Sequence, residues 1–195
     1  VSTYRQLERL SNQVANLLCS LGVKKGDRVT GVLSRRPETI AIMIGVWKAG
    51  AIYVPIFTGF AGEAIRMRLQ SCGANLVFVH HEHRTRVDVP EDITVLTIAG
   101  ERGLGLERGD ISFWQALRDQ PECFEAEVCS RRDPAIILYT SGSTGESKGV
   151  EIASNFLASV RPYMRFGLDL QLTDTFWPTG DPGWGYGLVC YHAAM

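Results

Sequence analysis

The stretch that most narrows the fold of this chain is Ala135 to Ala153, AIILYTSGSTGESKGVEIA. Its apolar opening, AIILY, predicts a buried strand over Ala135–Tyr139, and GVEIA at its end predicts a short strand over Val150–Ala153. Between them lies a segment rich in glycine and hydroxyl side chains that includes Lys148. A Ser/Gly-rich linker would explain that composition, but not the buried strand directly before it or the lysine.

The glycine segment has the chemistry of a phosphate-binding loop. Its glycines allow backbone angles closed to other residues and let N–H groups approach a ligand. Hydroxyls such as Ser141 and Ser143 can donate to phosphate oxygens, Thr144 or a neighbour can contact a phosphate-bound metal, and Lys148 adds a positive charge. We therefore predict that this loop binds phosphate.

The Walker A loop of kinases and ATPases is the nearest alternative. It requires Gly-Lys-Ser/Thr at the start of a helix. Here Ser147 precedes the lysine, Gly149 follows it, and the next residues have a strand-like pattern. The Walker A interpretation fails on both residue type and context.

Upstream of the loop, helix patterns alternate with short apolar runs. A Thr3–Gln6 capping box and a left-handed stop at Gly22 bound the first helix. Repeated β–α–β alternation predicts an α/β fold with a mostly parallel β-sheet flanked by helices on both faces. The expected strands are Arg28–Ser34, Ala51–Phe57 and Asn75–Val79, and the expected helices between them are Pro37–Ala49 and Glu63–Cys72.

The pattern is less regular over residues 82–132. We expect a strand over Ile93–Ile98, a surface loop over Gly100–Gly109 and a short helix over Ser112–Asp119. Beyond the second strand of the glycine segment, a helix should begin near Ser154 and be kinked or shortened by Pro162.

Composition limits the function classes. The chain has 195 residues, 45% hydrophobic and 21% charged, with a formal net charge of −1, so nothing predicts attraction to nucleic acid. Its longest apolar stretch, Thr39 to Phe57, is interrupted by Lys48 and predicts a buried helix and strand instead of a membrane span. No oligomeric state is predicted.

The five cysteines are odd in number and include no CxxC pair, so neither a disulfide framework nor a zinc site is indicated. Cys19 and Cys72 lie at apolar helix positions and are expected to be small core residues. This usage favours a cytoplasmic protein. The chain starts at Val1 and stops at Met195 with no terminal signal, so we expect a piece of a longer protein.

YTSGSTGESKGV resembles the phosphate-loop motif of the adenylate-forming superfamily, which includes acyl-CoA synthetases, peptide-synthetase adenylation domains and luciferases. Those proteins usually have proline where Ser147 stands, a departure that removes a rigid residue but no ligand. TYRQLERLSNQVANLLCSLGVKKGDRV and RPETIAIMIGVWKAGAIYVPIF are also similar to superfamily segments. The resemblance assigns ATP phosphate binding to Thr140, Ser141, Gly142, Ser143, Thr144, Gly145 and Lys148.

By this resemblance, residues 1–195 form part of the large N-terminal adenylation (AMP-binding) domain. The rest of that domain and a small C-terminal domain would lie beyond Met195, together with the motifs for adenine, ribose, metal and the catalytic lysine. The implied small molecules are ATP, Mg²⁺, CoA and a fatty or short-chain carboxylic acid. No residue of this chain is assigned a catalytic or metal-binding role.

The turn from Phe57 to Phe60, with Glu63-Ala64, is similar to the acetyl-CoA synthetase branch. The alternative is an ordinary glycine turn. The branch also places arginines that contact the CoA nucleotide near HHEHRTRV, where a solvated loop is the alternative, and the histidines of that stretch indicate no metal site. The resemblance assigns CoA contacts to Phe57, Thr58, Gly59, Arg84 and Arg86.

FWPTGDPGWGYG resembles the acyl-CoA synthetase segment beside the acyl pocket, which assigns Trp184, Gly185 and Tyr186 to that pocket. Without the resemblance it predicts a tight turn with an aromatic residue packed in the core. Acetate-specific members carry a bulkier residue where Gly185 stands, which implies an acyl group longer than acetate.

The resemblance implies ATP-dependent activation of a carboxylic acid to acyl-AMP, followed by transfer of the acyl group to CoA. Two alternatives stay open. The first is an amino-acid adenylation domain that loads a carrier protein, and the second is a non-catalytic nucleotide-binding module.

Overall fold

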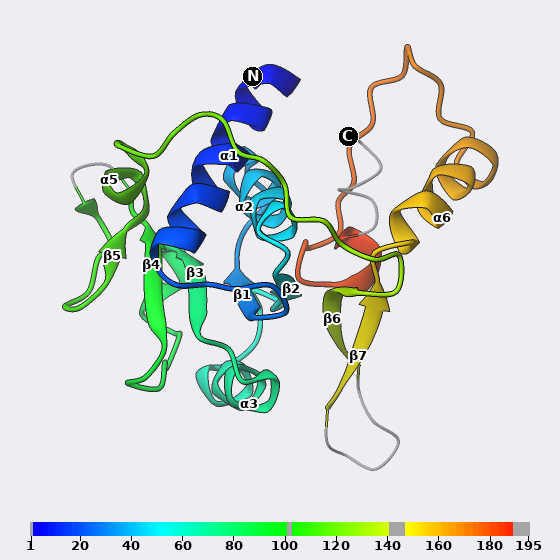
Figure 1. The fold of residues 1–195 in the computed structure, drawn as a ribbon. Coiled ribbons are helices and arrows are strands. Elements are labelled where there is room, and N and C mark those ends of the chain that lie inside the picture. The colour runs from blue at the N-terminus through cyan, green and yellow to red at the C-terminus, as the bar shows by residue number, and fades with distance from the viewer. Residues whose placement is uncertain (1, 101–102, 141–146, 189–195) are drawn as a thin grey trace.

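A single seven-stranded sheet forms the centre of the protein in the computed structural model, which describes residues 2–100, 103–140 and 147–188 (Figure 1). The strand order is β5-β4-β3-β1-β2-β6-β7. All neighbours pair in parallel except β6 and β7, which are antiparallel. The strands are β1 (Arg28–Val32), β2 (Ile52–Pro55), β3 (Leu76–His80), β4 (Thr94–Ile98), β5 (Ile111–Ser112), β6 (Pro134–Thr140) and β7 (Lys148–Ala153).

Residues at the helix ends account for where several helices begin and end. Thr3 and Gln6 form the predicted capping box, Pro37 opens the second helix, and Gly73 ends the third with φ 60°. The α-helix that carries Pro162 ends at that residue and continues as a π-helical turn. The helices are α1 (Tyr4–Ser20), α2 (Pro37–Lys48), α3 (Gly62–Cys72), α4 (His81–Arg84), α5 (Phe113–Leu117), α6 (Phe156–Pro162) and η2 (Tyr163–Gly167).

Helices cover both faces of the parallel part of the sheet. In β3, Leu76 and Phe78 pack into the cluster that contains α1 and α2, while Val77 and Val79 pack with α3 on the other face. Figure 1 shows α1 and α2 on one side of the sheet and α3 on the opposite side. The predicted fold class is therefore confirmed.

Some local expectations were wrong. Cys19 is exposed and Cys72 half-buried, so only the second approaches the predicted core position. The helix expected over Ser112–Asp119 is shortened to Phe113–Leu117, because the preceding residues form β5 against β4. Residues His81–Arg84, expected in an irregular segment, form the short helix α4.

The sheet topology gathers several chain segments at one edge. Because β1, β2, β3 and β6 run parallel, the residues that follow each of them emerge on the same side. The chain passes from β1 to β2 in one direction and then crosses to β3 on the other side of β1. Such a switch in strand order leaves a crevice outside the carboxyl ends of the strands, where ligands bind in open α/β sheets.

In the part of the chain described, no helix is long and apolar enough to cross a membrane.

Candidate functional site

The two ends of the predicted phosphate loop lie opposite each other. Thr140, the last residue of β6, pairs in register with Lys148, the first residue of β7, and Tyr139 pairs with Gly149. Thr140 and Lys148 are both exposed. Residues Ser141, Gly142, Ser143, Thr144 and Gly145 lie outside the described residues.

A cavity of about 560 Å³ adjoins these two strand ends. Its walls come from β2, α3, the β6–β7 pair and the Gly183–Gly185 turn, so it joins Thr140 to Trp184 and Gly185. The lining residues are Pro55, Phe60, Arg68, Leu138, Tyr139, Thr140, Ser147, Gly183, Trp184 and Gly185. A mixed lining of apolar walls and a few polar groups is typical of a small-molecule site.

The turn predicted for CoA and the turn predicted for the acyl pocket are in direct contact. The Thr58 hydroxyl donates to Asp181 Oδ2 at 2.6 Å, and the Phe57 and Trp184 rings meet edge to face at 6.1 Å. A Cβ on Gly183 would lie 2.4 Å from the carbonyl oxygen of Ile56, so only glycine permits this approach. Trp184 is 60% exposed, so the alternative of an aromatic residue packed in the core is wrong.

Gly59 and Arg86 complete the first of these turns. The Phe57 ring folds over Gly59, where a Cβ would lie 2.5 Å from Phe57 Cε1. Arg86 Nη2 donates to the carbonyl oxygen of Thr58 at 3.2 Å. The predicted CoA residues Phe57, Thr58, Gly59 and Arg86 are thus neighbours.

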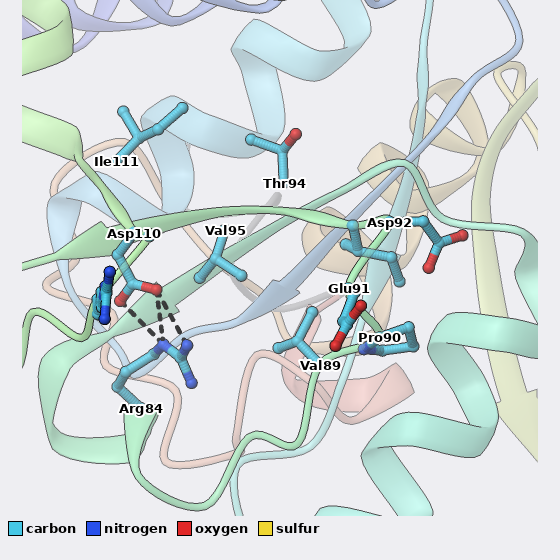
Figure 2. A pocket seen from close by; sticks show the side chains of 12 residues that line it. Arg84, Val89, Pro90, Glu91, Asp92, Thr94, Val95, Asp110 and Ile111 are labelled. Carbon is cyan, nitrogen blue, oxygen red and sulfur yellow. Dashed lines mark hydrogen bonds and ion pairs between the residues drawn. The ribbon is translucent and has the colours of Figure 1, made fainter.

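Arg84 lies elsewhere and its guanidinium is engaged within the chain (Figure 2). The residue is 9% exposed, so the solvated-loop alternative is wrong for it. Its Nε and Nη2 donate to Asp110 at 2.9 to 3.1 Å, and Nη1 lies 3.1 Å from Glu107 Oε2. Burial raises the pKa of Asp110, but hydrogen bonds from Arg84 and Thr97 outweigh burial and hold that pKa below its usual value. Of the two arginines, only Arg86 is shown bonded to the Phe57–Phe60 turn, through the Thr58 carbonyl oxygen, whereas Arg84 is occupied by Asp110 and Glu107.

Sequence reasoning missed a polar cluster that follows β1 and β3. His83 Nδ1 lies 2.8 Å from Arg86 Nη2, and His83 Nε2 lies 2.7 Å from Ser34 Oγ. Because arginine only donates, Nδ1 is the acceptor and Nε2 carries the proton that it donates to Ser34. The Ser34 hydroxyl in turn donates to Glu82 Oε1. His83 therefore cannot take a proton from Ser34, which excludes a Ser–His nucleophile here.

Two further residues differ in their relation to the cavity. Arg68 lines it, although nothing in the sequence singled it out; the one available indication was its place on the helix that follows the Phe57–Phe60 turn. Tyr186 was predicted to line the acyl pocket, but the residues that form the cavity end at Gly185, and the Tyr186 hydroxyl accepts from Tyr163 Oη at 3.4 Å.

Within the described ranges, no group of three His, Cys, Asp or Glu side chains is placed to hold a metal ion.

Comparison with known proteins agrees with this arrangement. Acetyl-coenzyme A synthetases from Chromobacterium violaceum and Bacillus subtilis are 35% and 34% identical to this chain, over 97% and 96% of its length. The chain spans only about a third of those relatives, 32% and 33%. A crystal structure of Brucella canis acyl-CoA synthetase superposes with a TM-score of 0.88 and 36% identity, over 96% of this chain and 34% of that one.

The family comparison covers nearly the whole sequence. The profile described as AMP-binding enzyme matches residues 2–195. Together with the shared fold, this confirms the resemblance inferred from the glycine segment and its neighbours. The chain belongs to the AMP-binding enzyme family and corresponds to an N-terminal portion of its longer members.

Proposed function

We propose that the protein containing this chain is an AMP-forming acid–thiol ligase of the acyl-CoA synthetase type. The observation that carries the proposal is the meeting of three segments at one sheet edge: the strand ends Thr140 and Lys148, the turn Phe57–Phe60, and the turn Asp181–Gly185. Separately, each has an ordinary structural explanation. Together they place groups suited to phosphate, to a thiol-bearing nucleotide and to an acyl chain around one cavity, which Thr140, Phe60 and the Gly183–Gly185 turn line directly.

The reaction would proceed in two balanced steps. A carboxylate oxygen attacks the α-phosphorus of ATP, which forms acyl-AMP and releases pyrophosphate. The CoA thiol then attacks the acyl carbon, loses its proton and releases AMP, which leaves a thioester. Positioning and charge neutralisation supply most of the catalysis in such displacements.

Residues of this chain would bind and orient the reactants. Thr140 and Lys148, with Ser141, Gly142, Ser143, Thr144 and Gly145, would hold the ATP phosphates, and Mg²⁺ would accompany those phosphates as their counter-ion. Trp184 and Gly185 would form a wall for the acyl group, with Tyr186 close by. The turn of Phe57, Thr58 and Gly59, with Arg86, would contact CoA.

The acyl group is proposed to be longer than acetate. Relatives at 34–35% identity are named for acetyl-CoA synthesis, but Gly185 leaves its part of the cavity wall without a side chain. A Cβ at Gly185 would meet only Leu138 Cδ1, at 3.5 Å, so the wall has room for more atoms of substrate. Among the described residues, Cys19, Cys72, Cys123 and Cys129 are free thiols, which supports a reducing, cytoplasmic location.

The proposal is tested with the full-length protein that carries this chain. Carboxylate-dependent exchange of labelled pyrophosphate into ATP is expected, with thioester formation when CoA is added, and kcat/KM higher for propionate or butyrate than for acetate. This chain alone should show no exchange. Preference for acetate would overturn the chain-length proposal. Transfer to a carrier protein but not to CoA would identify an adenylation domain, and ATP binding without exchange a non-catalytic module.

A further inference from the structure

Arg68 occupies a constrained position beside the strand ends. It lies on α3 and lines the cavity, with its guanidinium carbon 4.1 Å from the centre of the Phe60 ring and 5.5 Å from that of Tyr139. A guanidinium held against aromatic faces gains a favourable electrostatic contact and loses rotational freedom. The direction of its N–H groups is therefore restricted before any ligand arrives.

Two hydrogen bonds determine where those N–H groups point. Nη1 donates to the Ala64 carbonyl oxygen at 2.7 Å, one helical turn earlier, and Nη2 donates to Ser147 Oγ at 2.8 Å. On the other strand, Tyr139 Oη approaches the Arg68 carbonyl oxygen at 3.4 Å. One residue of α3 thus contacts both strands of the β6–β7 pair, at Tyr139 and immediately before Lys148.

The start of β7 has little other support. It is the outermost strand of the sheet, paired in the described residues only with β6, and its first four residues are exposed. Ser147, immediately before this strand, is not a proline, so no ring fixes its φ. The Arg68–Ser147 hydrogen bond is a restraint on this residue that comes from outside the β6–β7 pair.

We propose that Arg68 is a positioning residue that fixes Ser147 and thereby holds Lys148 opposite Thr140. Arg68 acts through Ser147 and does not itself contact the phosphates. The consequence for ATP binding rests on the proposed function, whereas the restraint on the start of β7 does not.

Hydrogen exchange in the full-length protein tests the restraint directly. Arg68→Met keeps an unbranched side chain between the two rings but removes both hydrogen bonds. Backbone amides of residues 147–153 should exchange at least about threefold faster in this variant, because the start of the strand opens more often. The matched control is Arg66→Met on the same helix, which removes an exposed ion pair with Asp88 and should leave that exchange unchanged.

Kinetics test the consequence. Losing a charge-assisted hydrogen bond should raise KM for ATP about tenfold in Arg68→Met, with kcat within about threefold of wild type, because ground state and transition state lose the same binding. Ser147→Ala should change KM in the same direction. Ser147→Thr keeps the hydroxyl and should restore the wild-type value. Arg68→Met with Ser147→Ala should be no worse than Arg68→Met alone.

The proposal would be overturned if the amides of residues 147–153 exchanged at the wild-type rate in Arg68→Met. It would also be overturned if the KM effects of the two single variants multiplied independently in the double variant. A third contrary outcome is an Arg68→Met variant that loses kcat and melting temperature while its KM for ATP is unchanged. If the wild-type protein shows no acid-dependent exchange of pyrophosphate, the proposed function fails. The hydrogen-exchange comparison then decides the role of Arg68 by itself.

Discussion

At the scale of the residue, burial determines the protonation state of His80, at the carboxyl edge of the sheet. It ends β3 fully buried, and its Nδ1 accepts a hydrogen bond from the Ser34 N–H at 2.8 Å. Burial, and then the positive charge of Arg36, lowers the pKa of His80 from 6.5 to about 4. The imidazole is therefore neutral in the folded protein at neutral pH and carries its proton on Nε2.

This low pKa predicts a loss of stability in mild acid. Below pH 6.5 the unfolded chain protonates His80, while the folded chain does not until about pH 4. The unfolded state thus binds more protons in this window, so the free energy of unfolding should fall, by up to about 3 kcal/mol, as the pH drops through it. Burial also lowers the pKa of His83, which adds in the same direction.

Denaturant titrations at pH 7, 6 and 5 measure this effect. In His80→Asn, where the side-chain oxygen can still accept from Ser34, the fall in the free energy of unfolding should be clearly smaller than in wild type. It should not vanish, because His83 remains. Equal slopes for the two proteins would contradict the assignment to His80.

At the scale of elements, α1 and α2 pack closely where they cross. A Cβ on Gly45 would lie 2.6 Å from Val14 Cγ1 and 2.9 Å from the Ser11 carbonyl oxygen. Gly45→Ala should therefore destabilise the protein by about 1–2 kcal/mol, because overpacking exceeds the gain in helix propensity. The denaturation midpoint should shift while the m-value stays constant.

A second substitution relieves part of this crowding. Adding Val14→Ala to Gly45→Ala removes the contact with Val14 Cγ1 but leaves the contacts with Val14 Cβ at 2.7 Å and with the Ser11 carbonyl oxygen at 2.9 Å. The double variant should thus be more stable than the sum of the single changes predicts, yet less stable than wild type. Strict additivity would show that Val14 and Gly45 are not in contact in solution.

The same two helices show what sequence periodicity could and could not predict. It found α1 and its capping box, because both depend on neighbours in sequence. Periodicity alone does not decide burial, since Tyr4, the first residue of α1, is 70% exposed. Ser11 and Asn12 are buried instead, because Lys48 of α2 reaches both side chains, at 2.9 and 2.6 Å. Such pairing depends on how helices cross, which local patterns do not contain.

In the candidate site, too, features of adjacent residues could be predicted from the sequence, and contacts between distant residues could not. The glycine segment predicted phosphate binding because the chemistry lies in adjacent residues. The Ser34–Glu82–His83 cluster and the Arg68–Ser147 bond join residues 48 to 79 positions apart, and they exist only because the chain crosses from one side of β1 to the other. Family resemblance named the Phe57 and Trp184 turns, but only the fold showed that they touch.

At the scale of the whole molecule, apolar exposure is uneven. The residues after β7 carry several exposed apolar side chains, and in Figure 1 the orange segment beyond α6 extends away from the sheet. Trp177 is 78% exposed and Trp184 60%, whereas the helices of the parallel part bury continuous clusters. Exposed apolar groups gathered in one region indicate a surface that another part of a protein covers.

The relatives suggest what that covering is. This chain spans about a third of their length, and we expect the remaining two thirds of the full-length protein to pack against the segment around Trp177. This chain has four tryptophans, and in the test variants every tryptophan except Trp177 is replaced, both in this chain and in the rest of the full-length protein. Acrylamide quenching of Trp177 should then be several-fold weaker in the full-length variant than in this chain alone. A variant that keeps only Trp114, 45% exposed on α5, is the matched control and should quench equally at both lengths. Equal quenching of Trp177 at both lengths would show that Trp177 is also exposed in the full-length protein. The rest of the protein would then not cover this apolar segment.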